Sequence, residues 1–477
     1  MRVLLLVGLW LCLDLRADRP NVLWIVSDDL GPDVGCYGTR HVATPNVDRL
    51  AREGRRYLNA FASAPVCSPS RSAFITGMYQ TTIAAHHHRT HLMKPLPEGC
   101  RPVTAPFRDA GYFVCNMPAP DDKREKAKED YNFLHDGSLY DGDDWGKRRP
   151  GQPFFAQVQI FEPHRTFVAN TDPERPAEVD LSPLYPDHPV TRADHANYLA
   201  SVEEMDRKVG LVLQRLEDEG LTDSTIVILF GDHGRPHVWG KQWLYDAGLR
   251  TPLIIRWPGR IRPGSVDAGM VSLIDIAPTS LAAVGLPVPA KMQGVDILAE
   301  GFRGRDAIYA ARDRCGDAPD RIRAVRTERF KYIRNFHPEL PYTQLSSYKK
   351  LQYPVLTLLQ VIHRQGRLSP EQDRLLQPTR PAEELYDLQA DPYEMRNLAA
   401  EPGFAKELIH HRNLLEKWIT DTDDQGRFPE GDAEYMADLM KEKTTYYERS
   451  MKRRKLAPDI SDRAYLEWWK KELGLKR

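Results

Sequence analysis

The feature that most constrains the fold of this chain is a set of short apolar segments, two of them followed directly by acidic and histidine side chains. Residues 21–26 read Asn-Val-Leu-Trp-Ile-Val and precede Ser-Asp-Asp, while residues 225–230 read Thr-Ile-Val-Ile-Leu-Phe and precede Gly-Asp-His-Gly. Residues 154–160 and the shorter segment 112–115 are further strand candidates. Nearly continuous apolar runs of this length are typical of strands buried on both faces of a sheet. The polar residues behind them are therefore predicted to gather at one sheet edge.

Segments with helical periodicity lie between these runs. Residues 44–54 begin with Thr-Pro and stop at a glycine, and residues 192–219 place apolar side chains at helical spacing. Alternation of strands and helices predicts an α/β fold in which a large, mainly parallel sheet is sandwiched by helices. Residues 323–334 alternate as a strand of a smaller sheet, which predicts a second, smaller C-terminal α+β domain.

Charge and cysteine content exclude two classes of protein. The chain has 66 Lys and Arg against 67 Asp and Glu, a formal net charge of −1, so nothing in its overall charge predicts a nucleic-acid partner. Its 6 cysteines in 477 residues do not make a disulfide scaffold. One or two disulfides among Cys36, Cys100, Cys115 and Cys315 are allowed, and their pairing stays open.

The N-terminus has the pattern of a secretory signal. Met-Arg is followed by an apolar run over residues 3–13, with a possible cleavage site near Ala17, so residues 1–18 are predicted to be a signal peptide. A buried N-terminal strand or helix is the alternative. The run is too short for a stable membrane span. We therefore expect an exported protein of a periplasmic, secreted or lysosome-like compartment.

Two pairs of adjacent residues that could bind a metal ion form a candidate metal site. Asp28 and Asp29 follow one buried run, and Asp232 and His233 follow another. Adjacent buried carboxylates repel one another and lose solvation, a cost that a divalent cation removes. The oxygen ligands suit Ca²⁺ or Mg²⁺, whereas the imidazole would also suit Mn²⁺ or Zn²⁺. Either pair alone is more often a solvated turn.

A cysteine motif lies between the two pairs in sequence. Residues 67–71 read Cys-Ser-Pro-Ser-Arg at a predicted helix start, which Ser68 or Ser70 could cap. A nucleophile at Cys67 would face unpaired backbone N–H groups that favour an anion, and Arg71 would project on the same side about one turn later. The alternative is a buried or disulfide-bonded cysteine.

The motif and its surroundings resemble the type I, formylglycine-dependent sulfatases of the alkaline phosphatase superfamily. Cys-x-Pro-Ser-Arg is their signature, and similar segments occur here in the family's order. They are residues 19–23, 44–50, 240–259, 384–388 and 391–398. The resemblance implies a catalytic domain over residues 19–310, with a boundary to a smaller domain that covers residues 311–477 and ends in a helical tail.

The resemblance also implies roles for individual residues. Cys67 would be oxidised to formylglycine by a sulfatase-maturing enzyme, and its hydrate would be the nucleophile. One divalent metal ion, expected to be Ca²⁺, would be bound by Asp28, Asp29, Asp232, His233 and the modified Cys67. Catalytic roles fall to Arg71, which would stabilise developing charge, to His164 as general acid, and to Lys241 as a sulfate contact.

One departure from the family pattern concerns a Lys-x-x-His string. Many sulfatases carry this string after a Gly-Tyr strand, but the residues after Gly111 lack it here. Residues 128–133 instead resemble the Lys-x-Asp-Tyr-Asn-Phe string of a family subset. Lys128 is therefore the predicted sulfate-binding lysine. The missing histidine is assigned to His86, with His88 as second choice. Four histidines within residues 86–91 could instead form an exposed or adventitious metal-binding loop.

The resulting hypothesis is a sulfatase that hydrolyses a sulfate ester or sulfamate, on a carbohydrate such as a glycosaminoglycan. The overall pattern is similar to heparan N-sulfatase and to bacterial glycosaminoglycan sulfatases. A phosphonate monoester or phosphodiester hydrolase is the enzymatic alternative, because such enzymes share the fold. A sulfated-glycan binding protein with unmodified Cys67 is the non-enzymatic one.

Overall fold

A seven-stranded sheet forms the centre of the computed structural model, which describes residues 19–124 and 126–475. The predicted signal peptide lies outside these residues. In spatial order the strands are β4 (Phe113–Pro118), β6 (Phe154–Ile160), β1 (Asn21–Ser27), β7 (Thr225–Gly231), β8 (Arg250–Arg256), β2 (Arg55–Phe61) and β9 (Ser265–Ser272). The run β4-β6-β1-β7 is parallel, and β8 is antiparallel to both of its neighbours. The mainly parallel sheet is thus confirmed.

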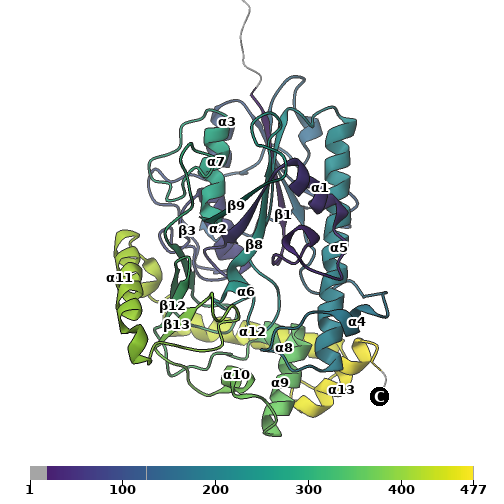
Figure 1. Cartoon of the computed structure of the whole chain (residues 1–477), viewed down its shortest axis with the longest axis vertical. Helices are drawn as coiled ribbons and strands as arrows, with labels where there is room; N and C mark the ends of the chain where they lie inside the picture. Colours follow the sequence, from purple (N-terminus) through teal and green to yellow (C-terminus); the bar gives the residue numbers. More distant parts are fainter. Residues whose placement is uncertain (1–18, 125, 476–477) are drawn as a thin grey trace, which may run out of the picture.

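Helices cover both faces of this sheet (Figure 1). On one face α1 (Pro45–Glu53) and α5 (Pro189–Asp218) pack against the side chains of Leu23 and Ile25 in β1. On the other, α2 (Cys67–Thr76), α3 (Thr104–Asp109) and α7 (Ile276–Ala283) pack against the intervening residues of the same strand. Because successive strand residues point to opposite faces, an almost uninterrupted apolar strand is what a two-sided core requires.

The helix that carries the cysteine motif is buried along its whole length. Every residue of α2 is buried, so its position is fixed by packing on all sides. The predicted serine cap is wrong: Val66 is the N-cap and offers no side-chain bond. The Ser70 hydroxyl instead donates to the Asp232 carbonyl at 2.5 Å, and Ser68 accepts from the backbone of Arg89. Both serines fix α2 against neighbouring segments.

A second, antiparallel sheet forms the smaller domain. Its strands are β10 (Ile308–Arg312), β11 (Ile322–Arg326), β12 (Phe330–Asn335) and β13 (Glu383–Asp387). The single strand predicted over residues 323–334 is two strands of a hairpin, closed by a bond from the Thr327 N–H to the Phe330 carbonyl. β10 crosses the predicted boundary at residue 310, whose exact place stays a prediction.

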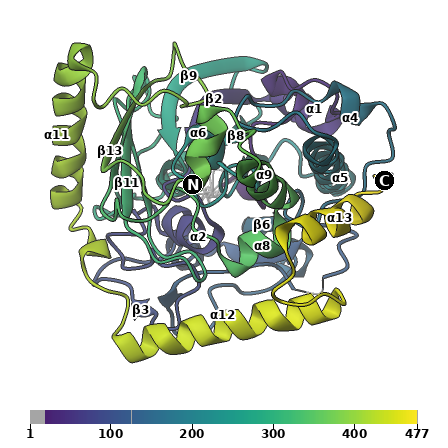
Figure 2. The same cartoon turned by 90° about the horizontal axis from the view of Figure 1, so that it is seen from below.

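The remaining elements surround the second sheet and the lower end of the first (Figure 2). They are α4 (Arg175–Glu178), α6 (Asp246–Leu249), α8 (Ser347–Gln352), α9 (Pro354–Arg364), α10 (Pro370–Asp373), α11 (Ala405–Asp421), α12 (Ala433–Arg453), α13 (Asp462–Glu472) and the short pair β3 (Lys94–Pro95) and β5 (Phe133–Leu134). The predicted helical tail is the pair α12 and α13. α12 packs against α8, and α13 packs against α9.

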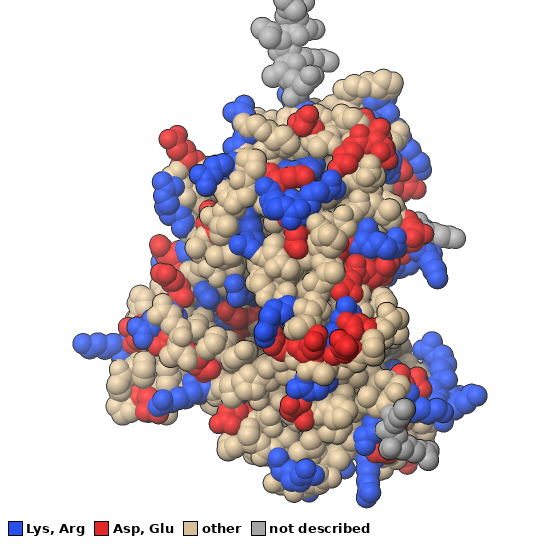
Figure 3. Space-filling view, turned by 45° about the vertical axis from the view of Figure 1, so that its right-hand side comes forward, with Lys and Arg blue, Asp and Glu red and all other residues tan. Residues whose placement is uncertain are grey.

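Charged side chains of both signs are mixed over the face in Figure 3, in keeping with the balanced composition. Among the described residues, the five cysteines are free, so no disulfide forms between them. No helix in the described part of the chain is long and apolar enough to cross a bilayer.

Candidate active site

The predicted acidic pairs meet at the carboxyl end of the parallel strands. Ser27 of β1 lies opposite Gly231 of β7, so the residues that follow these two strands are neighbours. The Asp29 N–H donates to Asp232 Oδ1 at 2.9 Å, and the backbone at Asp29 adopts a left-handed φ of 64°. The side chains of Asp28, Asp29 and Asp232 are at most 1% exposed. Three carboxylates are therefore held together away from water.

Cys67 is the first residue of α2 and points into this group. Its Sγ lies 3.4 Å from His233 Nε2 and 3.9 Å from Asp29 Oδ1. The ammonium of Lys241 donates to the same sulfur at 3.4 Å and to Asp29 Oδ1 at 2.7 Å. The structure thus brings the predicted nucleophile, metal ligands and one predicted sulfate contact together.

Two further predicted cations complete the cluster. Lys128 Nζ lies 2.9 and 2.8 Å from the two Asp28 oxygens. Arg71 donates from Nε to Asp232 Oδ2 at 3.0 Å and from Nη2 to Asp28 Oδ1 at 3.4 Å. Lys128, the predicted sulfate-binding lysine, is thus in contact with a carboxylate of the cluster.

These contacts decide the charge of the buried carboxylates. Burial raises the pKa of Asp28, but the positive charges of Lys128 and Arg71 outweigh it and hold the pKa well below its usual value. Burial likewise opposes the charged form of Lys241, whose pKa Asp29 nevertheless raises well above the ordinary range. Asp28 and Lys241 are therefore charged at neutral pH, whereas burial raises the pKa of Asp232.

The donor set fits a divalent cation. Ligand atoms of Asp28, Asp29 and Asp232 lie within 4.8 Å of one another, as do those of Asp29, Cys67 and His233. Buried carboxylate oxygens are the preferred ligands of Ca²⁺ and Mg²⁺. Lysine is a flexible point charge, so the Lys128 and Lys241 ammonium groups can leave the carboxylates to a metal ion and turn towards an anion.

His164 lies at the edge of the cluster, after β6. Its Nδ1 is 2.5 Å from the Arg165 carbonyl, an acceptor, so Nδ1 carries the hydrogen and Nε2 faces Asp29 Oδ2 at 3.8 Å. Burial lowers the pKa of His164 to about 4. The ring is therefore neutral at pH 7 in the ligand-free protein, and a bound anion would raise its pKa.

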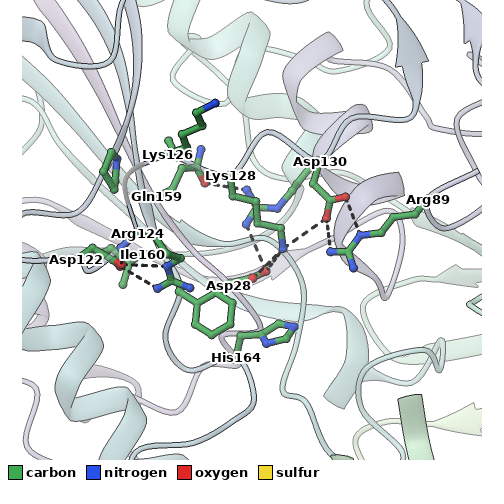
Figure 4. Close-up of a pocket in the computed structure, with 14 residues that line it drawn as sticks. Asp28, Arg89, Asp122, Arg124, Lys126, Lys128, Asp130, Gln159, Ile160 and His164 are labelled. Atoms are coloured by element: carbon green, nitrogen blue, oxygen red, sulfur yellow. Dashed lines mark hydrogen bonds and ion pairs between the residues drawn. The ribbon is translucent and has the colours of Figure 1, made fainter. Parts of the chain in front are cut away.

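A cavity of about 480 Å³ opens beside the cluster and gives a ligand access to it (Figure 4). Asp28, Arg71, Lys128 and His164 line its inner part. The rim adds Arg89, whose guanidinium forms two bonds to Asp130 at 2.9 and 2.8 Å. More cations than carboxylates line the cavity, which favours an anionic ligand.

The predicted histidine His86 is not brought to this site. It is 6% exposed, and the charged groups that act on it are Arg323, Asp424, Glu430 and Lys94. Its ring points to the second domain because packing, rather than position in the sequence, decides which histidine of a cluster faces a site.

His88, the second choice, lies closer to the site's charges. After burial, Arg89 contributes most to lowering the pKa of His88, and Lys241 also acts on it. The role assigned to His86 stays a prediction that its surroundings do not support.

Three residues at the site were missed by the sequence analysis. Gln159 accepts from Arg71 Nη1 at 2.8 Å, Arg89 lines the cavity, and the ring of Tyr348 lies 5.2 Å from Lys241 Nζ. Two glutamines, Gln157 and Gln159, interrupt the apolar residues of this buried strand and were a usable signal for a polar contact there. Tyr348 comes from α8 in the second domain, and no local pattern links it to the site.

Comparison with known proteins agrees with this geometry. The family profile described as Sulfatase matches residues 20–286, more than half of the chain. An ulvan-active sulfatase of Formosa agariphila is 33% identical over 87% of this chain and 77% of its own length. The chain belongs to the sulfatase family. This sulfatase is therefore a sulfuric ester hydrolase, and the resemblance to type I sulfatases is confirmed.

A second profile, N-sulphoglucosamine sulphohydrolase C-terminal, matches residues 231–350 of this sulfatase. The human N-sulphoglucosamine sulphohydrolase is 29% identical over 88% of this chain and 93% of its own length. The second match therefore reaches from the end of β7, beside the carboxylate cluster, to α8, where Tyr348 lies.

Solved structures confirm the fold of this sulfatase. A protein solved with its substrate D-glucosamine-2-N,6-O-disulfate has a TM-score of 0.63 and 19% identity, covering 85% of this chain and 98% of its own. The phosphonate monoester hydrolase of Agrobacterium radiobacter has a TM-score of 0.60 and 20% identity, covering 85% and 96%. One architecture thus occurs with two chemistries.

Proposed function

We propose that this chain is an exported, metal-dependent carbohydrate sulfatase that cleaves a sulfate ester or a sulfamate, with Cys67 converted to formylglycine by a maturing enzyme. The main support for this proposal is the position of Cys67 at the start of a buried helix. Its Sγ lies 3.4 Å from both His233 Nε2 and Lys241 Nζ. An unmodified structural cysteine would need neither the carboxylates nor the cations around it. The sugar is inferred from relatives that are named as ulvan-active and N-sulphoglucosamine enzymes.

Each charged group of the cluster has a task in this proposal. Asp28, Asp29, Asp232 and His233 would hold the divalent ion, expected to be Ca²⁺, together with an oxygen of the modified Cys67. The ion would polarise a sulfate oxygen, and the hydrated aldehyde would supply the hydroxyl that attacks sulfur and a second hydroxyl that later expels sulfate.

The remaining residues bind the anion and move a proton. Lys241 and Lys128 would bind sulfate oxygens once released from Asp29 and Asp28, and Arg71 would stabilise developing negative charge. His164 lines the cavity, and its Nε2, 3.8 Å from Asp29 Oδ2, would protonate the leaving oxygen or nitrogen. A sulfate anion close to His164 would raise its low pKa and so supply the required proton.

The direct test is sulfate release from defined substrates. Purified protein, matured in its native host or with a co-expressed maturing enzyme, is incubated with sulfated monosaccharides, sulfated polysaccharides and 4-nitrophenyl sulfate, and sulfate is measured by ion chromatography. Release from a sugar sulfate or sulfamate is expected. Matched 4-nitrophenyl phosphodiesters and phosphonates test the alternative, and faster cleavage of these would overturn the proposal.

The modification has its own readout. Mass spectrometry of the peptide that contains Cys67 distinguishes an aldehyde from a thiol. An intact thiol in protein from the native host would rule out the formylglycine mechanism and would favour the sulfated-glycan binding protein.

A further inference from the structure

The cavity holds a guanidinium group that the proposed sulfate chemistry does not use. Arg124 lines the rim, and its side chain is 41% exposed. Figure 4 shows Arg124 and Arg89 on opposite sides of Asp28 and Lys128. A sulfate bound over Asp28 and Lys128 would therefore leave the Arg124 side of the cavity to another part of the same substrate.

Arg124 is held in position before any ligand arrives. Its Nε and Nη2 donate to the two oxygens of Asp122 at 3.0 and 2.8 Å. Its guanidinium carbon lies 3.7 Å from the centre of the Phe161 ring, a stacked cation–π arrangement. A fixed guanidinium loses less side-chain freedom on binding than a mobile one, so binding an anion costs less here.

The charge of Asp122 is shared between two cations. Lys208 Nζ lies 3.1 Å from Asp122 Oδ2 and 2.7 Å from Glu162 Oε2. Asp122 and Arg124 both line the cavity, but the Asp122 side chain is only 4% exposed, whereas that of Arg124 is 41% exposed. In this ion pair the positively charged Arg124 is therefore the partner that is more accessible to a ligand.

One edge of the guanidinium remains open. Arg124 Nη1 has no hydrogen-bond partner among residues 19–124 and 126–475, while Nε and Nη2 are both used. The two N–H groups of Nη1 are thus left to a ligand at a guanidinium that lines the cavity, and its planar geometry suits a carboxylate or sulfate. At a cavity already lined by Lys128 and Arg71, this is a second place for a negative group.

We propose that Arg124 forms a second anion subsite that binds an additional acidic group of the substrate, a carboxylate or a further sulfate. The group is carried by the sugar that bears the scissile sulfate or by its neighbour. This inference rests on the proposed function and narrows its substrate class to carbohydrates with at least two acidic groups. Phe161 and Asp122 act as positioning residues for Arg124.

The test compares substrates that differ by one acidic group. One pair is D-glucosamine-2-N-sulfate and D-glucosamine-2-N,6-O-disulfate, and the other is a sulfated polysaccharide with its uronic carboxylates intact or reduced to alcohols. The first pair reports a second sulfate and the second pair a carboxylate. Wild type and Arg124→Gln are compared by kcat/KM for sulfate release and, in a Cys67→Ala background, by calorimetric binding.

The expected result is a preference of wild type for the more acidic member of a pair by roughly 10-fold to 100-fold, most of which Arg124→Gln removes. The matched control is Arg101→Gln, an exposed arginine paired with Asp109 outside the cavity, which keeps the preference. Equal use of both members by wild type, or an unchanged preference in Arg124→Gln, overturns the subsite. Absence of sulfate release by wild type instead counts against the proposed function, since binding is measured separately.

Discussion

Buried charge is arranged in two different ways in this molecule. At the catalytic edge of the large sheet, Asp28 and Asp29 are compensated by the lysines Lys128 and Lys241, and a cavity opens beside them. In the second domain, the fully buried Arg323 lies between Asp313 and Asp424, with N–O distances of 2.5 to 3.1 Å. The carboxylates of both groups are buried, but only those of the first group lie beside the cavity described above.

The different cations of the two groups indicate that the first group serves activity and the second serves stability. Lysine ammonium groups on flexible stems can change partners when a metal ion and an anion arrive, whereas an arginine fork bound to two carboxylates has no better partner to move to. Breaking a buried pair leaves an uncompensated charge, which costs several kcal/mol. We therefore expect substitutions at the first cluster to change activity and substitutions at the second to change stability.

The largest effect is expected at Cys67. Cys67→Ala should lower the rate of sulfate release at least about 10⁴-fold, because the nucleophile is lost. Its free energy of unfolding should change by no more than about 1 kcal/mol. Sulfate release and chemical denaturation measure the two quantities. Cys100→Ala, at a half-buried cysteine outside the site, is the control and should keep its activity. Activity of Cys67→Ala within tenfold of wild type would contradict the assignment.

The opposite behaviour is expected at Arg323. Arg323→Met leaves Asp313 and Asp424 buried without their cation, so the free energy of unfolding should fall by about 3 to 5 kcal/mol. Activity per folded molecule should persist. Urea denaturation measures the effect, with Arg334→Met as control, since Arg334 forms an exposed pair with Glu416 that is worth at most about 1 kcal/mol. An equal loss of unfolding free energy in Arg323→Met and Arg334→Met would contradict the stabilising role of the Arg323 group.

Metal binding should also distinguish the catalytic cluster from another buried ion-pair group of the second domain, in which Asp320 pairs with Arg312 and Arg380. After treatment with EDTA, addition of Ca²⁺ at about 100 times its Kd should stabilise wild type by about 2.7 kcal/mol. Asp28→Asn should lose most of this gain. Asp320→Asn, which breaks the pairs with Arg312 and Arg380, should start from a lower Tm but keep the gain. Thermal melts at increasing Ca²⁺ check both expectations, and a Ca²⁺ response in Asp28→Asn like that of wild type would remove Asp28 from the ligand set.

The sequence predicted the part of the fold that depends on local pattern. Apolar runs buried on both faces identified β1, β6 and β7, and the acidic residues behind them converge as parallel strands require. β2 was not predicted, because it starts with Arg55 and Arg56 and carries an irregular register near Tyr57. The hairpin of β11 and β12 was read as one strand, since its turn at residues 327–329 contains neither glycine nor proline.

The residues of the candidate site likewise fall into those that the sequence predicted and those that it did not. Asp28, Asp232 and Cys67 follow from positions at element ends, which a single sequence shows. His86 was chosen for its place in a run of histidines, and Arg89 was passed over although it is the residue that reaches the cavity. Which side chain of a loop faces a site depends on the packing of distant segments, here on the second domain.

The smallest predicted effect concerns Lys349, a buried lysine of the second domain that, within the described part of the chain, is not paired with a carboxylate as Arg323 is. Lys349 is 1% exposed, donates to the Gln344 carbonyl at 3.0 Å and lies 4.5 Å from the Trp243 ring centre. Burial lowers the pKa of Lys349 to about 7, in contrast to Lys241, whose pKa the adjacent Asp29 raises. Lys349, which forms no ion pair with a carboxylate of the described residues, is thus predicted to be partly neutral near physiological pH.

This lowered pKa has a definite sign in stability. Between about pH 7 and 10.5 the unfolded chain binds a proton at Lys349 that the folded chain does not, so stability rises with pH across this window and is lost as pH falls towards 7. Between pH 7 and 9 wild type should gain roughly 1 to 2 kcal/mol relative to Lys349→Met, in which the titrating group is absent. Urea denaturation of both proteins at these pH values isolates the lysine, because all other groups are shared. Parallel pH profiles of the two proteins would show instead that Lys349 stays charged in the folded protein.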